Sequence, residues 1–414
     1  MTDSILEQQL RNRKNPIEVI QVGLGFMGFG FLSNNQYTKH FRIPLVISRR
    51  PEEAKSFLLA HGVLALVEEK PAAIRDNAAK NIISVSDNLD LIKELEAPIV
   101  FEVTGTVDYG TEVALKTLEA KKHLVTMNPE LQATVGTELK HMFDKEKLII
   151  TDVVGDQPGS LARLIASTHY KGFKVRLAGN MKRYMDVHAT QTKMKPWADD
   201  KGLAVRQTVS FTDGTKQSIE MNLVSNYYGM TIFEAGMRGP KVEKFDEVLK
   251  SFDWNAVPPE GVVDYMIGIN LFPGVFVVAE HNDPQQQKYL RYLNMGEGPR
   301  YVLFDSYHLC HLEVGETIAR VALFGEETIN NGLNPTTKTI TIAKQDLVQG
   351  QSLDGIGGDT IYGSIRKATT NKDYLPIGVA VGSVLKRDIP QDAPIRIEDV
   401  ELPTNAATKL LGLM

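Results

Sequence analysis

Residues 19–28 read Val-Ile-Gln-Val-Gly-Leu-Gly-Phe-Met-Gly, and this stretch decides the fold. A short apolar run ends in Gly-x-Gly-x-x-Gly, the pattern of a strand, a tight turn and a helix start in dinucleotide-binding folds. The first glycine makes the turn, the second lets the backbone approach a pyrophosphate, and the third lets helix and strand pack closely. An ordinary turn is the alternative interpretation. The residues predicted to line a cofactor here are Gly23, Gly25, Phe26, Met27 and Gly28.

The residues after the second predicted strand, Phe41–Ile47, indicate which dinucleotide binds. About 20 residues past the motif, NAD enzymes usually place Asp or Glu against the ribose hydroxyls. Here Ser48, Arg49 and Arg50 occupy that place. A carboxylate would repel a 2′-phosphate, whereas a hydroxyl and two guanidiniums can bind it. We therefore predict NADP in preference to NAD, with solvated surface charges as the alternative interpretation of the arginines.

Apolar strands alternate with helical stretches over residues 17–155. The segments Val107–Ala120 and Thr137–Lys145 have helix-like composition. This alternation is typical of an α/β fold with a doubly wound parallel sheet, the Rossmann arrangement. The predicted strands are Val19–Val22, Leu45–Ile47, Pro98–Val103, His123–Met127 and Leu148–Val154.

Two of these strands end in stretches that suit a ligand, Glu102–Thr106 and Thr126–Glu130. Ligands of doubly wound sheets bind outside the carboxyl ends of the strands. Turn formation alone is the alternative, because Gly, Thr, Asn and Pro favour turns anywhere. The cofactor contacts predicted at these strand ends are Thr104, Gly105, Thr106, Asn128 and Pro129.

Composition excludes several classes of protein. A chain of 414 residues predicts two or three domains. The net charge of −5 offers no basic footprint for nucleic acid. No apolar run reaches the roughly 18 residues of a membrane span, and the polar first residues lack a signal-peptide core. The single cysteine, Cys310, excludes an internal disulfide and favours a reducing compartment, so we expect a cytoplasmic protein.

The sequence pattern changes after the first predicted domain. Polar and glycine-rich connections recur, and the last 80 or so residues consist of short strand-like segments around turn clusters. We predict a Rossmann domain over 1–155, an α+β substrate domain over 156–305, a return segment over 306–335 and a small β-rich domain over 336–414.

Several local predictions concern these later segments. Residues 160–170 look helical, and Thr337–Ala343 alternates as a strand does. Further strands are predicted at Val175–Leu177, Val205–Phe211, Gly274–Val278 and, as short pieces, within Pro376–Val400.

The cofactor half resembles homoserine dehydrogenases in Gly23–Gly28, Phe101–Thr106 and His123–Asn128. The whole chain is similar to homoserine-dehydrogenase-like oxidoreductases with a C-terminal antifreeze-like (SAF) domain. That subset includes the second type of 1-deoxy-D-xylulose 5-phosphate reductoisomerase and an oxidoisomerase of D-apionate. The further matching stretches are Gly155–Gly159, Gly179–Lys182, Asp213–Lys216, Val263–Tyr265, Pro273–Phe276, Tyr307–Glu313, Leu353–Gly358 and Gly382–Asp388.

The resemblance implies an SAF-like domain at residues 336–414 and a homodimer. One feature departs from homoserine dehydrogenases, which carry Gly-x-Asp followed three residues later by Lys. Here Lys182 is followed by Arg183-Tyr-Met-Asp186 and a polar insert. Homoserine is therefore disfavoured as the substrate, and membership of the subset leaves the substrate open.

Two lysines are candidate catalytic residues. Lys182 closes a Gly-Asn-x-Lys stretch, where it could hold a substrate anion or polarise a carbonyl. Lys216, in Asp-Gly-Thr-Lys, is a similar candidate, although Asp-Gly is also the signal of a hairpin tip. For both, a solvated surface position is the alternative interpretation.

His308, Cys310, His311 and Glu313 lie within six residues and invite a metal interpretation. On a strand these side chains would alternate between two faces, so the four could not meet one ion. We interpret the segment as a strand or helix entry that lines the cofactor pocket. His308 is then a candidate proton carrier, with a structural histidine as the alternative.

An isomerisation would benefit from Mg²⁺ or Mn²⁺ bridging two neighbouring oxygens. Asp186, Glu220, Asp264 and Glu313 are the acids near matching stretches, and no spacing selects ligands among them. The favoured function is an NADP-dependent oxidoreductase that isomerises a small anionic polyol, sugar phosphate or sugar acid. The alternatives are dehydrogenation of a hydroxy-amino acid, as in homoserine dehydrogenases, and a non-catalytic nucleotide-binding sensor.

Overall fold

The computed structural model describes residues 3–268 and 270–413, and the chain divides into two compact units. The first unit comprises the chain up to Asn128, together with Glu138–Asp156 and Leu309–Thr328. The second comprises Pro129–Thr137, Gln157–His308 and the chain from Ile329 onward. Within the described residues, no helix is long and apolar enough to cross a membrane.

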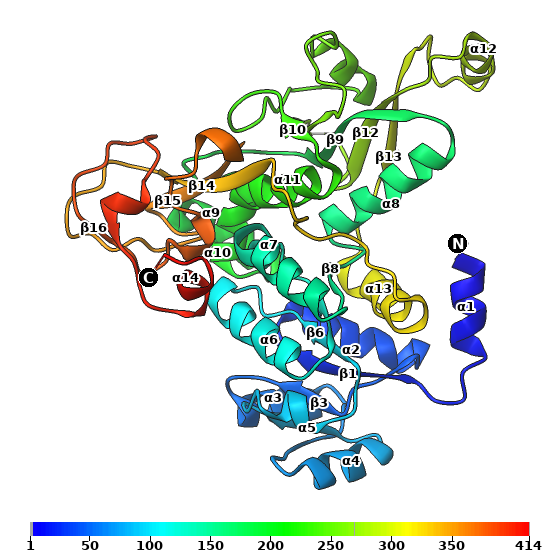
Figure 1. Ribbon diagram of the computed structural model, residues 1–414, viewed down its shortest axis with the longest axis vertical. Coiled ribbons are helices and arrows are strands. Elements are labelled where there is room, and N and C mark those ends of the chain that lie inside the picture. The colour runs from blue at the N-terminus through cyan, green and yellow to red at the C-terminus, as the bar shows by residue number, and fades with distance from the viewer. Residues whose placement is uncertain (1–2, 269, 414) are drawn as a thin grey trace. The chain divides into compact units, whose positions relative to one another are not determined.

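The chain up to Asn128, which makes up most of the first unit, is blue to cyan in Figure 1. The first unit is built on a parallel sheet of eight strands in the order β4-β5-β3-β1-β6-β7-β8, with β2 paired to the start of β1. Strand order reverses between β1 and β6, and this switch point is where doubly wound sheets bind ligands. The predicted Rossmann arrangement is confirmed. Its strands are β1 (Ile17–Val22), β2 (Phe41–Arg42), β3 (Leu45–Ile47), β4 (Ala65–Val67), β5 (Ile83–Ser86), β6 (Ile99–Glu102), β7 (His123–Thr126) and β8 (Ile150–Asp152).

Helices connect these strands, and a helix from late in the chain joins them. The last of them, α13, packs against α2, although α2 ends at Thr38 and α13 begins only at Cys310. The helices are α1 (Asp3–Arg11), α2 (Phe26–Thr38), α3 (Pro51–Ala60), α4 (Pro71–Ala79), α5 (Leu91–Glu94), α6 (Val107–Glu119), α7 (Pro129–Lys145) and α13 (Cys310–Phe324).

The strand predicted over Phe41–Ile47 is broken into β2 and β3. Pro44 lies in the break, and a proline has no N–H to donate to a ladder. Its carbonyl oxygen still accepts from the Ser84 backbone N–H at 3.1 Å, which joins the chain to β5.

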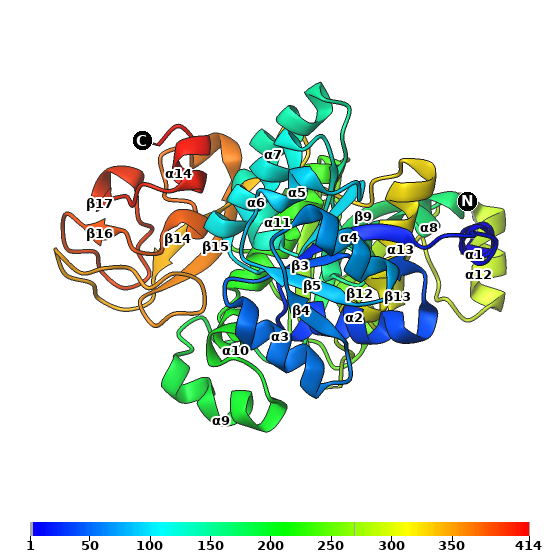
Figure 2. The ribbon, with the colours of Figure 1, turned by 90° about the horizontal axis from the view of Figure 1, so that it is seen from below.

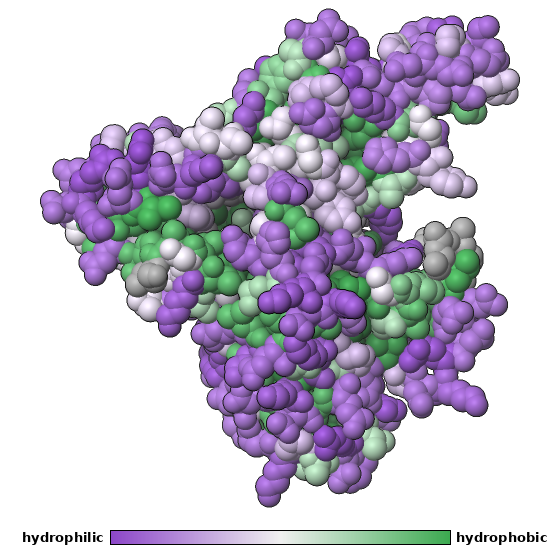
Figure 3. Space-filling view, in the orientation of Figure 1, coloured by the Kyte–Doolittle hydropathy of each residue, from purple (hydrophilic) through white to green (hydrophobic). Residues whose placement is uncertain are grey.

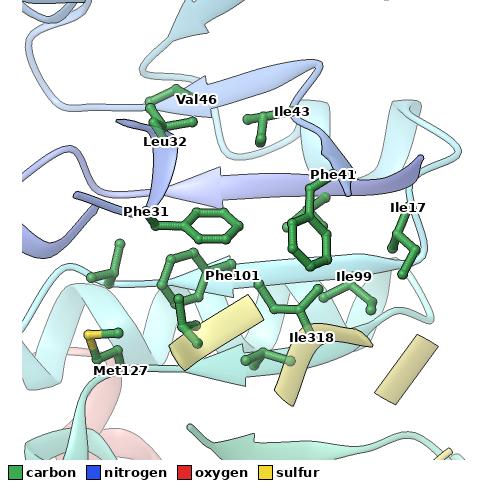
Figure 4. Packing of buried hydrophobic residues seen from close by; sticks show 14 of the residues in the cluster. Ile17, Phe31, Leu32, Phe41, Ile43, Val46, Ile99, Phe101, Met127 and Ile318 are labelled. Atoms are coloured by element: carbon green, nitrogen blue, oxygen red, sulfur yellow. The ribbon is translucent and has the colours of Figure 1, made fainter. Parts of the chain in front are cut away.

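Aromatic rings from a helix and two strands form the core of the first unit (Figure 4). The ring centroid of Phe31 in α2 lies 5.5 Å from that of Phe41 and 5.2 Å from that of Phe101. Ile318 of α13 lies in the same cluster. Burial of such side chains contributes about 1.5–3 kcal/mol each, so α13 is an integral part of this core.

The second unit contains a mixed sheet of five strands in the order β10-β11-β9-β12-β13. Strand β9 pairs in parallel with β11 and antiparallel with β12. Its strands are β9 (Lys174–Lys182), β10 (Thr231–Ile232), β11 (Val262–Ile267), β12 (Val275–Glu280) and β13 (Arg300–Asp305). Its helices are α8 (Gln157–Tyr170), α9 (Gln191–Lys201), α10 (Val205–Thr212), α11 (Thr215–Tyr228), α12 (Pro284–Tyr292) and the 3-10 helix η1 (Phe245–Lys250).

The prediction of a strand at Val205–Phe211 is wrong, because this segment forms α10. Val205 and Val209 are four apart, which is a helical spacing that a short apolar run can share with a strand. The turn at Asp213 and Gly214 joins α10 to α11, so the hairpin-tip alternative for this Asp-Gly pair is also wrong.

The last part of the chain belongs to the second unit and is rich in short strands (Figure 2). Thr337–Ala343 is a strand as predicted, and it pairs antiparallel with β15. This pair packs against α11. The elements are β14 (Thr337–Ala343), β15 (Ile361–Lys367), η2 (Ala368–Thr370), η3 (Ile377–Val379), β16 (Val384–Leu385), η4 (Ile397–Asp399), β17 (Val400–Glu401) and α14 (Ala406–Leu410).

Helix α12 has no buried residue and lies in the connection between β12 and β13. Asp283 caps it, its side chain accepting from the backbone N–H groups of Gln285 and Gln286. Its surface is mainly hydrophilic (Figure 3), and the cap supplies the local stability that burial does not.

Candidate active site

The glycine loop between β1 and α2 has the conformation that a phosphate-binding turn requires. Gly23 has a φ of +105°, and a Cβ there would lie 2.8 Å from the Val103 carbonyl oxygen. A Cβ on Gly28 would lie 2.7 Å from the Gly23 carbonyl oxygen. A Cβ on Gly25, the residue before α2, would meet no atom within 4 Å. The space beside Gly25 is therefore open where the helix amides favour an anion.

Gln21 holds this loop in shape and is absent from the predicted site. Its side-chain amide, which is fully buried, donates to the carbonyl oxygens of Gly23 at 2.8 Å and Gly28 at 3.1 Å. The only sign of this role in the sequence was an amide side chain within the apolar run Val19–Val22.

Glu102, at the end of β6, opens one of the two strand-end stretches predicted to suit a ligand, and it connects the ends of two strands. It is fully buried and accepts from the Thr104 backbone N–H at 2.8 Å, the Thr126 hydroxyl at 2.6 Å and Asn128 Nδ2 at 3.2 Å. Burial raises the pKa of this carboxyl, and these hydrogen bonds oppose the rise. Asn128 Nδ2 also donates to the Thr106 carbonyl oxygen at 3.0 Å. Three of the predicted cofactor residues at these strand ends, Thr104, Thr106 and Asn128, thus share one polar network.

The predicted 2′-phosphate residues follow β3 at the surface. The Arg50 backbone N–H lies 3.5 Å from the Ser48 hydroxyl, and its guanidinium pairs with Glu53 at 2.9 Å. The Arg49 guanidinium carbon lies 5.9 Å from the ring centre of Tyr109. Exposed ion pairs contribute about 0–1 kcal/mol, so the Arg50 pair is weak enough to exchange for a phosphate.

The other predicted cofactor residues differ in their surroundings. Phe26 is 66% exposed, whereas Met27 packs against the core of the first unit. Gly105 has a φ of +67°, which a residue with a side chain adopts at a cost. Pro129 is the first residue of α7.

In the second unit, buried amides surround a carboxylate. Asn180 of β9 donates from Nδ2 to Glu220 Oε2 at 2.8 Å and to Gln157 Oε1, and Gln217 Oε1 lies 3.4 Å away. Gln157 Nε2 lies 3.3 Å from His308 Nε2. This cluster joins α8, β9, α11 and the segment before α13, and none of the amides was predicted.

The two predicted lysines come from the elements that build this cluster. Lys182 ends β9, two residues from Asn180, so their side chains leave the same face of the strand. Lys216 lies one turn before Glu220 on α11, and its Nζ donates to Glu130 Oε1 at 3.0 Å. The Lys216 side chain is only 17% exposed, which disfavours the solvated interpretation.

A buried ion pair anchors the start of α11. Lys344 Nζ donates to Asp213 Oδ2 at 2.9 Å, the Gly358 carbonyl oxygen at 2.7 Å and the Ala189 carbonyl oxygen at 2.9 Å. Burial raises the pKa of the Asp213 carboxyl, and the Lys344 charge opposes that rise. Because Lys344 belongs to the C-terminal segment, that segment helps to position the helix that carries Lys216.

The segment from His308 to Glu313 is a helix entry, one of the two predicted forms. Cys310 opens α13, and Glu313 Oε2 accepts from the Leu309 backbone N–H at 2.7 Å. Among the described residues, no group of three or more His, Cys, Asp or Glu could hold a metal ion.

The predicted residues thus fall into two sets. Lys182, Lys216 and His308 all belong to the second unit. The predicted cofactor residues belong to the first unit, except Pro129.

Comparison with known proteins shows that the chain is similar to oxidoreductases. Residues 155–314 match the family model described as "Oxidoreductase DRL, catalytic domain". The chain is also 23% identical over 254 residues to the homoserine dehydrogenase of Lactococcus lactis, covering 56% of this chain and 57% of that protein. It therefore spans little more than half the length of this relative. Residues 155–314 are thus similar to an oxidoreductase catalytic domain.

Solved structures with low sequence identity also align with the chain. UDP-N-acetylglucosamine 3-dehydrogenase from Acidithiobacillus ferrooxidans has 11% identity and a TM-score of 0.43, covering 76% of this chain and 91% of that one. 1-Deoxy-D-xylulose 5-phosphate reductoisomerase from Zymomonas mobilis, in complex with NADPH, has 12% identity and a TM-score of 0.38, covering 74% and 83%.

Proposed function

We propose that this protein is an NADP-dependent oxidoreductase of the oxidoisomerase or reductoisomerase type. Its substrate is a small anionic polyol, sugar phosphate or sugar acid, such as 1-deoxy-D-xylulose 5-phosphate or D-apionate. The observation that carries the oxidoreductase part is the open space at Gly25, beside the switch point of a doubly wound sheet. The family-model match over residues 155–314 supports the same class.

The cofactor fits the residues of the first unit. Gly23, Gly25 and Gly28 would face its pyrophosphate, and Arg49 and Arg50 would hold its 2′-phosphate. Bound NADP would accept or supply a hydride. The residue roles in this proposal require no metal ion.

The second unit supplies the groups that hold the substrate. Lys216 is held in place by Glu130 and would bind the anionic group, since a charge-assisted contact is strongest where water is excluded. Lys182 would polarise the carbonyl or hydroxyl that changes oxidation state. His308 would hydrogen-bond a neighbouring oxygen while charge develops there. We further propose a homodimer and an SAF-like fold for residues 336–414.

Cofactor preference tests the first part of the proposal. NADPH should bind more tightly than NADH, and Arg49→Ala with Arg50→Ala should remove most of the preference, about 1.5–3 kcal/mol for a charge-assisted contact. Arg13→Ala, an exposed arginine bonded to the Asn15 carbonyl oxygen, is the matched control. Equal affinity for the two cofactors in the parent protein would overturn the assignment of NADP.

A substrate panel tests the second part. Cofactor turnover is measured with 1-deoxy-D-xylulose 5-phosphate, D-apionate and homoserine, each with and without EDTA. Lys182→Ala should lower turnover by about 10²-fold or more while NADPH still binds. Lys174→Ala, at the exposed start of the same strand, is the control and should leave turnover unchanged. Turnover of homoserine alone would establish the simple dehydrogenase, which the Lactococcus lactis relative favours, and cofactor binding without any turnover would establish the sensor.

A further inference from the structure

A chain of hydrogen bonds in the second unit runs from a buried carboxylate to His308. Glu220 is 3% exposed, and Asn180 is fully buried. Asn180 Nδ2 donates to Glu220 Oε2 and to Gln157 Oε1. Gln157, which is 5% exposed, places its Nε2 3.3 Å from His308 Nε2. Glu220, Asn180, Gln157 and His308, which come from separate elements, therefore form one chain of hydrogen bonds, which we call the relay.

The direction of each bond follows from the carboxylate. An ionised carboxylate only accepts hydrogen bonds, so Asn180 must turn its NH₂ group toward Glu220. The same NH₂ group faces Gln157, which must present its amide oxygen. The NH₂ group of Gln157 then points at His308, and the ring nitrogen that it meets must accept.

The other side of Asn180 supports this orientation. Within the described residues, its Oδ1 is buried and has no hydrogen-bond partner. Turning the amide over would place that oxygen among the side-chain oxygens of Gln157, Gln217 and Glu220. Oxygen atoms brought together in a buried site repel one another strongly. The observed orientation avoids this repulsion and leaves only Asn180 Oδ1 without a hydrogen bond.

We propose that Glu220, acting through Asn180 and Gln157, holds His308 as the neutral imidazole whose proton is on Nδ1. A neutral imidazole has one donor and one acceptor nitrogen, and here Nε2 is the acceptor. If Nε2 were protonated, its N–H would face the NH₂ group of Gln157, and two donors would meet. Removing this clash would require the amides of Gln157 and Asn180 to turn over, which would direct the Asn180 oxygen at the carboxylate of Glu220.

The consequence for catalysis rests on the proposed function. Nε2 is engaged by Gln157, so His308 does not serve as a general base through that nitrogen. Its donor nitrogen, Nδ1, is suited to stabilise negative charge that develops on a substrate oxygen. Glu220, Asn180 and Gln157 are positioning residues in this scheme.

The tautomer can be observed directly in the full-length protein. Long-range ¹⁵N–¹H correlation spectra of the histidine rings, recorded where the rings are neutral, distinguish Nδ1–H from Nε2–H. A His308→Gln variant assigns the signal. We expect Nδ1–H for His308, and Nε2–H in the parent protein would overturn the proposal. This readout does not depend on turnover, so a parent protein without turnover would count against the proposed function alone.

Glu220→Gln tests the origin of the tautomer. A glutamine at this position can donate to the side-chain oxygen of Asn180, so the amides of Asn180 and Gln157 can both turn over. The oxygen of Gln157 would then face His308, and we expect the His308 proton to move to Nε2. Glu260→Gln, in an exposed loop, is the matched control and should leave the tautomer unchanged. If Glu220→Gln does not fold, Gln157→Glu places a carboxylate against His308 and should produce the same change. A folded variant of either kind that keeps Nδ1–H would overturn the role of the relay.

Discussion

At the scale of single residues, the glycines of the cofactor loop are required for different reasons. A Cβ on Gly25 meets no atom, whereas a Cβ on Gly28 lies 2.7 Å from the Gly23 carbonyl oxygen. We expect Gly25→Val to fold and to lose NADPH binding, because its side chain fills the space that a pyrophosphate needs. Gly28→Val should lower thermal stability instead. Fluorescence titration with NADPH beside a thermal melt checks both, and binding by a folded Gly25→Val would show that the loop is only structural.

A buried carboxylate in β11 predicts a pH dependence of stability. Burial raises the pKa of Asp264 to about 6, although the backbone N–H groups of Arg238, Gly239 and Tyr265 donate to it. The pKa in the folded state is above the unfolded value, so the folded state binds the proton more tightly. The free energy of unfolding therefore falls as pH rises from about 4 to about 6, by about 3 kcal/mol for this group, and is flat above.

Urea unfolding at several pH values checks this dependence. Asp264→Asn cannot ionise, so the stability of the parent protein relative to the variant should decrease between pH 4 and 6. A difference that stays constant across that window would contradict the assignment of the raised pKa.

Sequence patterns predicted the residues whose roles are local. The glycine spacing identified a loop whose conformations the structure bears out, since turn, helix start and close packing all follow from neighbouring positions. Gln21 was missed as a site residue, although its partners, the carbonyl oxygens of Gly23 and Gly28, are only two and seven positions away. The role of Glu102 in joining two strand ends was also missed, because its partners Thr126 and Asn128 come from the end of another strand. A polar residue inside an apolar run was the only local sign of either.

At the scale of elements, prediction failed where a short segment depends on its neighbours. Val205–Phe211 has too few apolar residues for its period to separate helix from strand. Helix α11 buries polar residues on most of its surface, so it has no amphipathic pattern. Some of these polar groups meet partners more than 100 positions away, as Asn226 does when it accepts from the Thr337 backbone N–H at 2.9 Å.

The ion pair at the start of α11 predicts a large single-site effect. The side chains of Lys344 and Asp213 are 2% and 0% exposed, so Lys344→Met leaves a buried carboxylate without its charge partner. We expect a loss of about 3–5 kcal/mol in the free energy of unfolding, and a smaller loss when Asp213→Leu is combined with it. Chemical denaturation measures both, with Lys386→Met at an exposed position as the control. A loss no greater than that of the control would show that the pair adds nothing to stability.

At the scale of the whole molecule, the alternation of strands and helices predicted the parallel sheet, because each crossover in such a fold is local in the chain. The placement of the last 80 or so residues was not predictable in the same way. Their contacts with α11 join positions that are far apart, such as the Gly363 backbone N–H and the Thr215 hydroxyl at 2.8 Å. Ile365 of β15 lies in the same apolar cluster as residues of α8 and β9.

These contacts predict the result of ending the chain at Asn334. The truncated protein lacks Ile365 from the core of the second unit and Lys344 from the pair with Asp213, so the second unit should not fold stably. The described residues assigned to the first unit end at Thr328, so NADPH binding should survive in the truncated protein that stays soluble. Circular dichroism melts, dye binding to exposed apolar surface and NADPH titration measure the two effects separately. A truncated chain that melts like the full-length protein would mean that the C-terminal strands only cover α11, and that the core of the second unit is complete without them.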